Sequence, residues 1–175
     1  MISSYARTLL LLALILSFVF AGCQQQPADA ITHQQAEALG NIYVQARDQH
    51  NLDLLNQIYS PDVVVHDPMV AEPIQGLDAL KQYYERSHMA FPNLKTSLDE
   101  MYLDGDHIIW VWTFTGTNTG PMGDTPPTGK SVSFRGVAID MLSNGKIAEE
   151  WLYYNVLDSY TQLGMTMTPP APAEK

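Results

Sequence analysis

Residues 123–131 read GDTPPTGKS and end in the Gly-Lys-Ser of a phosphate-binding loop. That loop needs four residues between its first glycine and the Gly-Lys-Ser, because their N–H groups curl around the phosphates. Here five residues intervene, and Pro126 and Pro127 have no N–H to offer. Lys130 also opens an expected strand, whereas the phosphate-binding lysine opens a helix. We therefore interpret this segment as a turn and not as a nucleotide site.

His66 ends the run VVVH and is the first candidate for acid/base chemistry. Histidine as a residue type titrates near neutral pH, so its ring can take up or give up a proton. The alternative is a histidine at a strand end that hydrogen-bonds local backbone, beside an Asp67 that starts a turn with Pro68. The other histidines lack metal-ligand spacing, so we expect no metal site. No G-x-S-x-G motif supplies a hydrolase nucleophile.

Aromatic side chains on two expected strands are candidates for the wall of a binding pocket. In the last strand, alternation places Trp151, Tyr153 and Asn155 on one face. Trp112 lies on the bulky face of an earlier strand, HIIWVWTF. Stacked rings suit an aromatic or polyene ligand. Ordinary core packing explains the same residues without a ligand, and both interpretations stay open.

An α+β fold is predicted, because apolar residues first recur at helical spacing and from Leu94 onward alternate. Thr32 and Gln35 form a capping box at the start of the first helix. The helices are expected within residues 31–50, 52–60 and 76–92, with a strand at 62–66. Four further strands are expected at 94–104, 107–120, 130–142 and 146–155. Their short connections predict antiparallel neighbours, with one face of the sheet covered by the helices.

The start of the chain predicts export to a bacterial cell envelope. Residues 1–22 hold Arg7 and an apolar run too short to span a bilayer comfortably, which is typical of a signal peptide. The run ends in FAGC, which resembles the lipobox of bacterial lipoproteins, so we expect Cys23, the only cysteine, to carry lipid. An ordinary secretory signal is the alternative. If the cell is Gram-negative, Gln24 implies the outer membrane, facing the periplasm.

The length and the charge of the chain limit the domain organisation and the binding partners that we expect. We expect a tether over 23–30, one domain over 31–165 and a disordered, proline-rich tail over 166–175. With 19 acidic and 9 basic side chains, the formal net charge is −10. Such a charge argues against binding to nucleic acid or to anionic lipid, so the lipid anchor is the only membrane attachment expected.

Several segments occur in the order found in one known family. They are VVVHDP, Phe91-Pro92, FTGTNTGPMGDTPPTGKSVSFRG, GKIAEEW and the QLG at 162–164. Over roughly residues 33–165 the chain resembles SnoaL-like polyketide cyclases, also called ester cyclases. The resemblance implies the nuclear-transport-factor-like fold, in which three helices pack on a curved, largely antiparallel sheet to form a cone that encloses a pocket.

The resemblance also implies a chemistry. Characterised cyclases of this family close a ring by intramolecular aldol condensation with no metal and no cofactor, which requires proton transfer next to a carbonyl. The family's acid/base aspartate lies four residues after the tryptophan of its E-x-W segment, and here that position holds Asn155. An amide can hydrogen-bond a carbonyl but cannot remove a proton. Asp158 is one substitute if the chain is helical there, and His66 is another.

The sequence therefore supports three hypotheses. The first is a relative of the ester cyclases that acts on a small carbonyl or polyketide-like compound, with His66 and Asn155 nearest the reacting atoms. The second is a lipoprotein that binds a small apolar ligand without turnover, because of the amide at position 155. The third is an adaptor that uses the sheet face, through which a homodimer could also form. The expected pocket residues are Trp112, Trp151 and Tyr153.

Overall fold

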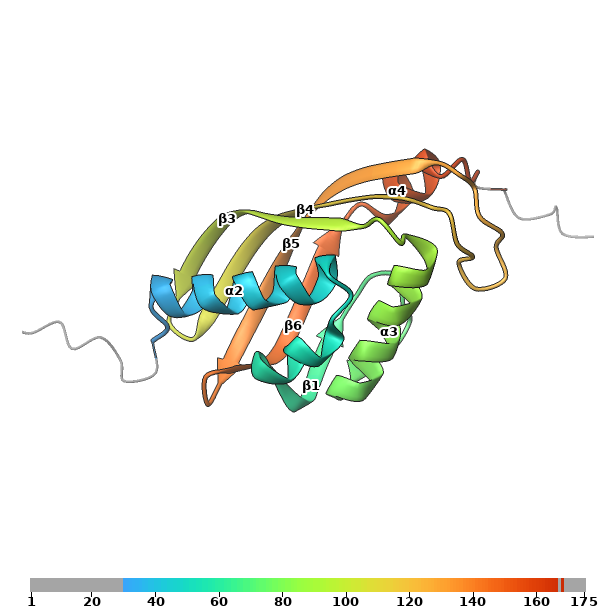
Figure 1. Ribbon diagram of the computed structural model, residues 1–175. Coiled ribbons are helices and arrows are strands. Elements are labelled where there is room, and N and C mark those ends of the chain that lie inside the picture. The colour runs from blue at the N-terminus through green and yellow to red at the C-terminus, as the bar shows by residue number, and fades with distance from the viewer. Residues whose placement is uncertain (1–29, 167, 169–175) are drawn as a thin grey trace, which may run out of the picture. The chain divides into compact units, whose positions relative to one another are not determined.

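The computed structural model describes residues 30–166 and 168 (Figure 1). The predicted signal peptide, Cys23, the tether up to residue 29 and the tail from residue 169 lie outside the described residues. Across the part of the chain that is described, no helix is long and apolar enough to cross a membrane.

Three helical segments form the first part of the domain, as predicted. They are the α-helix α2 (His33–Asp48), the 3-10 helix η1 (Leu52–Gln57) and the α-helix α3 (Leu77–Ala90). The capping box of α2 is confirmed. The Thr32 hydroxyl accepts from the Gln35 N–H at 3.3 Å, and Gln35 Oε1 accepts from the Thr32 N–H at 2.9 Å. Two N–H groups at the helix start are thereby satisfied.

One six-stranded sheet forms the rest of the domain (Figure 1). Its strands are β1 (Tyr59–His66), β2 (Ile74–Gln75), β3 (Lys95–Asp104), β4 (His107–Thr117), β5 (Ser131–Ser143) and β6 (Lys146–Tyr154). They lie in the order β2-β1-β6-β5-β4-β3, and only β1 and β6 are parallel. The largely antiparallel sheet is therefore confirmed. Sequence reasoning did not predict β2 or the short helix α4 (Val156–Gln162).

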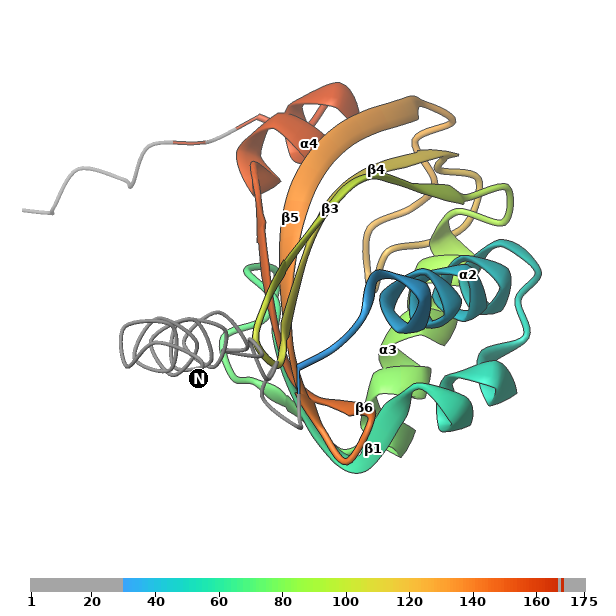
Figure 2. The same ribbon diagram turned by 90° about the vertical axis from the view of Figure 1, so that its left-hand side faces the viewer.

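The sheet is strongly curved, and α2 and α3 lie on its concave side (Figure 2). The register shifts between Leu98 and Glu100 in β3, and between Met141 and Leu142 in β5. Such bulges increase local bending. Apolar side chains from the helices and from the concave face form the core, with Leu55, Leu80 and Val63 fully buried. This arrangement confirms the predicted cone-shaped α+β fold.

Candidate functional site

A cavity of about 670 Å³ lies against the concave face of the sheet. Its volume falls within the range of small-molecule sites. Most of its wall is apolar or aromatic, including Tyr84, Phe91, Trp112, Phe134 and Leu152. A second, water-sized cavity of about 30 Å³ shares Tyr43, Trp112 and Leu152 with the first. The two cavities therefore belong to one interior region.

Asp67 is the only carboxylate among the described residues that line the large cavity. It is 8% exposed and accepts three hydrogen bonds. The Tyr154 hydroxyl donates to Oδ1 at 2.7 Å, the Met69 N–H donates to Oδ1 at 2.8 Å, and the Tyr83 hydroxyl donates to Oδ2 at 2.9 Å. Burial, and then the charge of Asp67, raises the pKa of both tyrosine hydroxyls. Both therefore stay protonated and hold the carboxylate in place.

Arg47 contributes a buried positive charge to the same wall. It lies in the last turn of α2 and is 5% exposed. The guanidinium carbon lies 3.9 Å from the centroid of the Tyr84 ring, and Nη2 donates to Ser87 Oγ at 3.3 Å. The adjacent end of the helix dipole and the ring face both favour a cation there.

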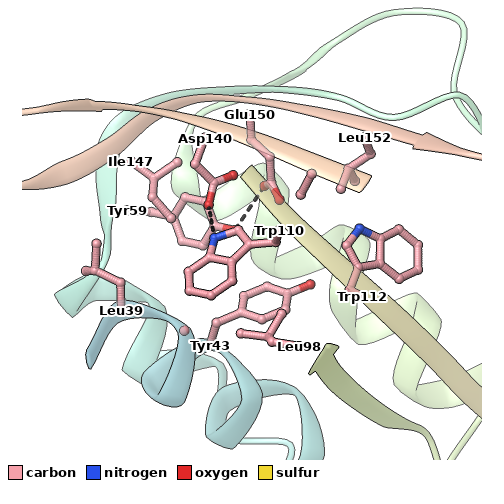
Figure 3. Close-up of a pocket in the computed structure, with 12 residues that line it drawn as sticks. Leu39, Tyr43, Tyr59, Leu98, Trp110, Trp112, Asp140, Ile147, Glu150 and Leu152 are labelled. Atoms are coloured by element: carbon pink, nitrogen blue, oxygen red, sulfur yellow. Dashed lines mark hydrogen bonds between the residues drawn. The ribbon is translucent and has the colours of Figure 1, made fainter. Parts of the chain in front are cut away.

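Two carboxylates meet in the smaller cavity (Figure 3). Asp140 on β5 and Glu150 on β6 are cross-strand partners, and each is 3% exposed. Trp110 Nε1 donates to Asp140 Oδ2 at 3.0 Å, and the Tyr59 hydroxyl donates to Glu150 Oε2 at 2.9 Å. Burial, and then Glu150, raises the pKa of Asp140 well above its ordinary value. Burial is also the main cause that raises the pKa of Glu150 to about 7.

The structure separates the predicted pocket residues. Trp112 lines both cavities, whereas Trp151 and Tyr153 line neither. Trp151 stacks against the His66 ring with centroids 5.3 Å apart, and Tyr153 is 58% exposed. The alternation along β6 is as expected, but the face that meets the helices carries Glu150, Leu152 and Tyr154. Trp151 and Tyr153 consequently lie on the other face.

The two predicted catalytic residues lie outside the residues that line the cavities. His66 Nε2 is 2.8 Å from Glu149 Oε1, in a partly exposed hydrogen bond. Asn155 caps α4, where its Oδ1 accepts from the Asp158 N–H at 3.0 Å. Asp158 lies in α4, so the chain has the helical conformation that Asp158 needs to substitute for the missing aspartate. Its carboxylate accepts a hydrogen bond from Gln162 Nε2 at 2.8 Å. The catalytic roles of His66 and Asn155 stay a prediction.

Sequence reasoning missed most of the charged groups in the interior. Arg47 follows Tyr43 at helical spacing on the apolar stripe of α2, and Asp140 interrupts the apolar run VAIDML. A charged residue within an apolar pattern is a signal that could have identified both positions. Asp67 was interpreted only as a turn residue. Its bond from the Met69 N–H agrees with that role, while its other oxygen faces Tyr83.

Comparisons with known proteins agree with this architecture. Residues 37–163 match the sequence profile of the family described as SnoaL-like polyketide cyclase. The chain belongs to this family, which confirms the resemblance seen in the sequence. No curated protein matches the chain.

Solved structures with the same fold include TsrD from Streptomyces laurentii, with a TM-score of 0.69 and 22% identity, covering 77% of this chain and 98% of TsrD. A protein from Acidithiobacillus ferrooxidans, named as a candidate polyketide cyclase, has a TM-score of 0.68 and 22% identity, covering 77% and 97%. AclR from Streptomyces galilaeus, named as a candidate hydroxylase, has a TM-score of 0.67 and 24% identity, covering 79% and 87%. At these identities the likeness establishes the fold alone.

Proposed function

We propose that the protein binds a small carbonyl compound with an apolar, ring-bearing body in the large cavity and promotes its cyclisation or isomerisation by acid/base chemistry. The observation that carries this proposal is a buried carboxylate and a buried guanidinium in the wall of one 670 Å³ aromatic cavity. The family to which the chain belongs supports the same class of reaction.

The side chains have complementary roles in such a reaction. Asp67 is the candidate base that removes a proton from the carbon next to a carbonyl. The Trp112 Nε1–H in the same wall donates to the carbonyl oxygen and stabilises the negative charge that then develops there, while Arg47 orients the substrate. The enolate carbon attacks a second carbonyl of the same molecule, and the new alkoxide takes back the proton from Asp67. The reaction neither gains nor loses electrons overall, so it needs no oxidant or reductant besides these residues.

Turnover of a panel of aromatic diketones that can undergo an internal aldol reaction tests the proposal. We expect the purified protein to cyclise at least one of them. Asp67→Asn, which keeps the size of the side chain, should lower kcat/KM by about 100-fold or more. His66→Gln, the matched change on the outer face of the sheet, should have little effect. Loss of turnover in His66→Gln with full activity in Asp67→Asn would instead assign the base to His66.

A second candidate function is ligand binding without turnover. The observation that favours it is Asn155, an amide at the position of the family's acid/base aspartate, whose side chain is engaged in capping α4. Under this alternative the wild-type protein retains ring-bearing carbonyl compounds but converts none of them. Turnover that appears only in Asn155→Asp would support it, because the cavity would then accept the substrate and lack only the base.

We also propose that the mature chain is lipid-anchored in a bacterial envelope through Cys23. Metabolic labelling with an alkyne fatty acid should mark the wild-type protein and not Cys23→Ser. A homodimer through the outer sheet face is a further proposal, which the exposed Tyr153 supports. Sedimentation of wild type and Tyr153→Lys tests it, since a charge at that point should dissociate such a dimer.

A further inference from the structure

Several donors in the wall of the large cavity have no hydrogen-bond partner. Among the described residues, the buried side-chain atoms without one include Nε and Nη1 of Arg47 and Nε1 of Trp112. Both residues line the large cavity. A buried donor that is left unpaired is costly, and a charged one more so. These atoms are therefore groups that a ligand in the cavity can satisfy.

The positive charge of Arg47 is fixed in position but not neutralised. Its ring contact with Tyr84 and its bond to Ser87 hold the guanidinium plane, and no carboxylate of the described residues lies within ion-pair distance of it. His88 Nε2 donates to the Arg47 carbonyl at 2.9 Å. Burial, and then Arg47, lowers the pKa of His88 to about 4, so this neighbour is neutral at pH 7.

The acid in the same cavity already accepts three hydrogen bonds. Both oxygens of Asp67 accept hydrogen bonds from tyrosine hydroxyls, and one also accepts from the Met69 N–H. The wall therefore presents a carboxylate with three donors, which leaves one lone pair for a substrate proton, and a guanidinium with two nitrogens that have no acceptor. This asymmetry favours a ligand that brings an acceptor with negative charge to Arg47.

We propose that the ligand of the large cavity is a monocarboxylate with an apolar, ring-bearing body, and that Arg47 binds its carboxylate. The inference rests on the proposed function, because it names the substrate class of the same cavity. A planar guanidinium matches the geometry of a carboxylate. One buried cation compensates a single negative charge, and a chain with a net charge of −10 disfavours a doubly charged ligand such as a phosphate monoester.

Trp112 adds a second point of recognition. Its unpaired Nε1–H is a donor only, so it suits a carbonyl or hydroxyl oxygen on the ring-bearing part of the ligand. The aromatic side chains around it, Phe134 and Tyr154, contact the indole edge-on at 5.9 and 5.5 Å between ring centroids. Aromatic rings of a ligand fit beside such a group.

Fluorescence titration of the purified full chain with anthracene-2-carboxylate, its methyl ester and 2-hydroxymethylanthracene tests the inference. The three probes share one ring system and differ only in the charged group. We expect the acid to bind about tenfold more tightly than the ester or the alcohol, as for a hydrogen-bonded charge pair. Arg47→Gln should remove this preference. Arg135→Gln is the matched control, because Arg135 on β5 is an exposed arginine outside the residues that line the cavity.

The outcomes separate the inference from the proposed function. Equal affinity of the wild-type protein for acid and ester would overturn the carboxylate assignment and leave the small-molecule site in place. A preference for the acid that persists in Arg47→Gln would also overturn it. Saturable binding of none of the probes would count against both proposals. If Arg47→Gln does not fold, the ratio of acid to ester affinity is measured for the wild-type protein and for Arg47→Lys, and this comparison still tests the inference.

Discussion

Glu150→Gln should remove a pH dependence of stability that the wild-type protein carries in its interior. Glu150 is 3% exposed and faces Asp140 across β5 and β6. Its pKa is raised from 4.5 in the unfolded chain to about 7 in the folded state, mainly by burial. Because the folded state holds this proton more tightly, the stabilising contribution is fully present below pH 4.5. It is lost as the pH rises through 7.

The size of the effect follows from the two pKa values. A rise from 4.5 to about 7 corresponds to about 3 kcal/mol of unfolding free energy. Glutamine has nearly the same shape and stays neutral, and its amide oxygen can still accept the Tyr59 hydroxyl. We expect the variant and the wild type to be similar in stability at pH 4. At pH 8 the variant should be more stable by about 3 kcal/mol.

Urea unfolding followed by tryptophan fluorescence at pH 4, 6 and 8 measures this difference. Glu85→Gln, the same chemical change at an exposed site on α3, is the control and should change stability by less than about 0.5 kcal/mol throughout. A stability difference between Glu150→Gln and wild type that stays constant from pH 4 to pH 8 would refute the reasoning, because the buried carboxyl would then not titrate in this window.

Three further substitutions test the packing around the cavities and the first helix. Gly136→Ala places a methyl group against the Trp112 ring, closer than van der Waals contact, so it should cost about 1–3 kcal/mol in urea unfolding and shift the tryptophan emission; unchanged values would mean that the indole moves freely. Tyr154→Phe removes one donor to buried Asp67 and should cost about 1–3 kcal/mol at neutral pH, whereas a neutral result would show that water replaces the hydroxyl. Thr32→Ala removes the cap of α2 and should cost about 1 kcal/mol by thermal or urea unfolding, and no change would indicate that the helix start is frayed in solution.

Much of the fold could be predicted because its signals are local. The capping box at Thr32 defined the start of α2, and alternation with short Gly and Asn connections defined β3 to β6 within a few residues. The parallel pairing of β1 with β6 joins segments far apart in the chain, so no local pattern indicated it. The short helix α4 was also missed, because its seven residues carry too little periodicity.

The site was harder to predict, because both faces of β6 carry an acid and aromatic side chains. Glu149, Trp151 and Tyr153 alternate with Glu150, Leu152 and Tyr154, so the pattern alone does not show which set the helices cover. Only the packing of α2 and α3 against the concave face decides it (Figure 2). The position of Arg47 in the cavity wall likewise depends on a helix and a sheet that come together only in the tertiary structure.

The distribution of buried charges connects stability with function in this domain. Asp67 and Glu150 have donors for their carboxylates, whereas Arg47 has two nitrogens without partners. A ligand that supplies acceptors to Arg47 lowers the free energy of the folded state by its own binding free energy. A substitution of Arg47 instead replaces one unfavourable buried group with another. The anthracene carboxylate should therefore raise the unfolding midpoint of wild type, and it should do so much less in Arg47→Gln. The ester should stabilise both proteins to a similar and smaller extent, since it gains only the apolar contacts of the cavity.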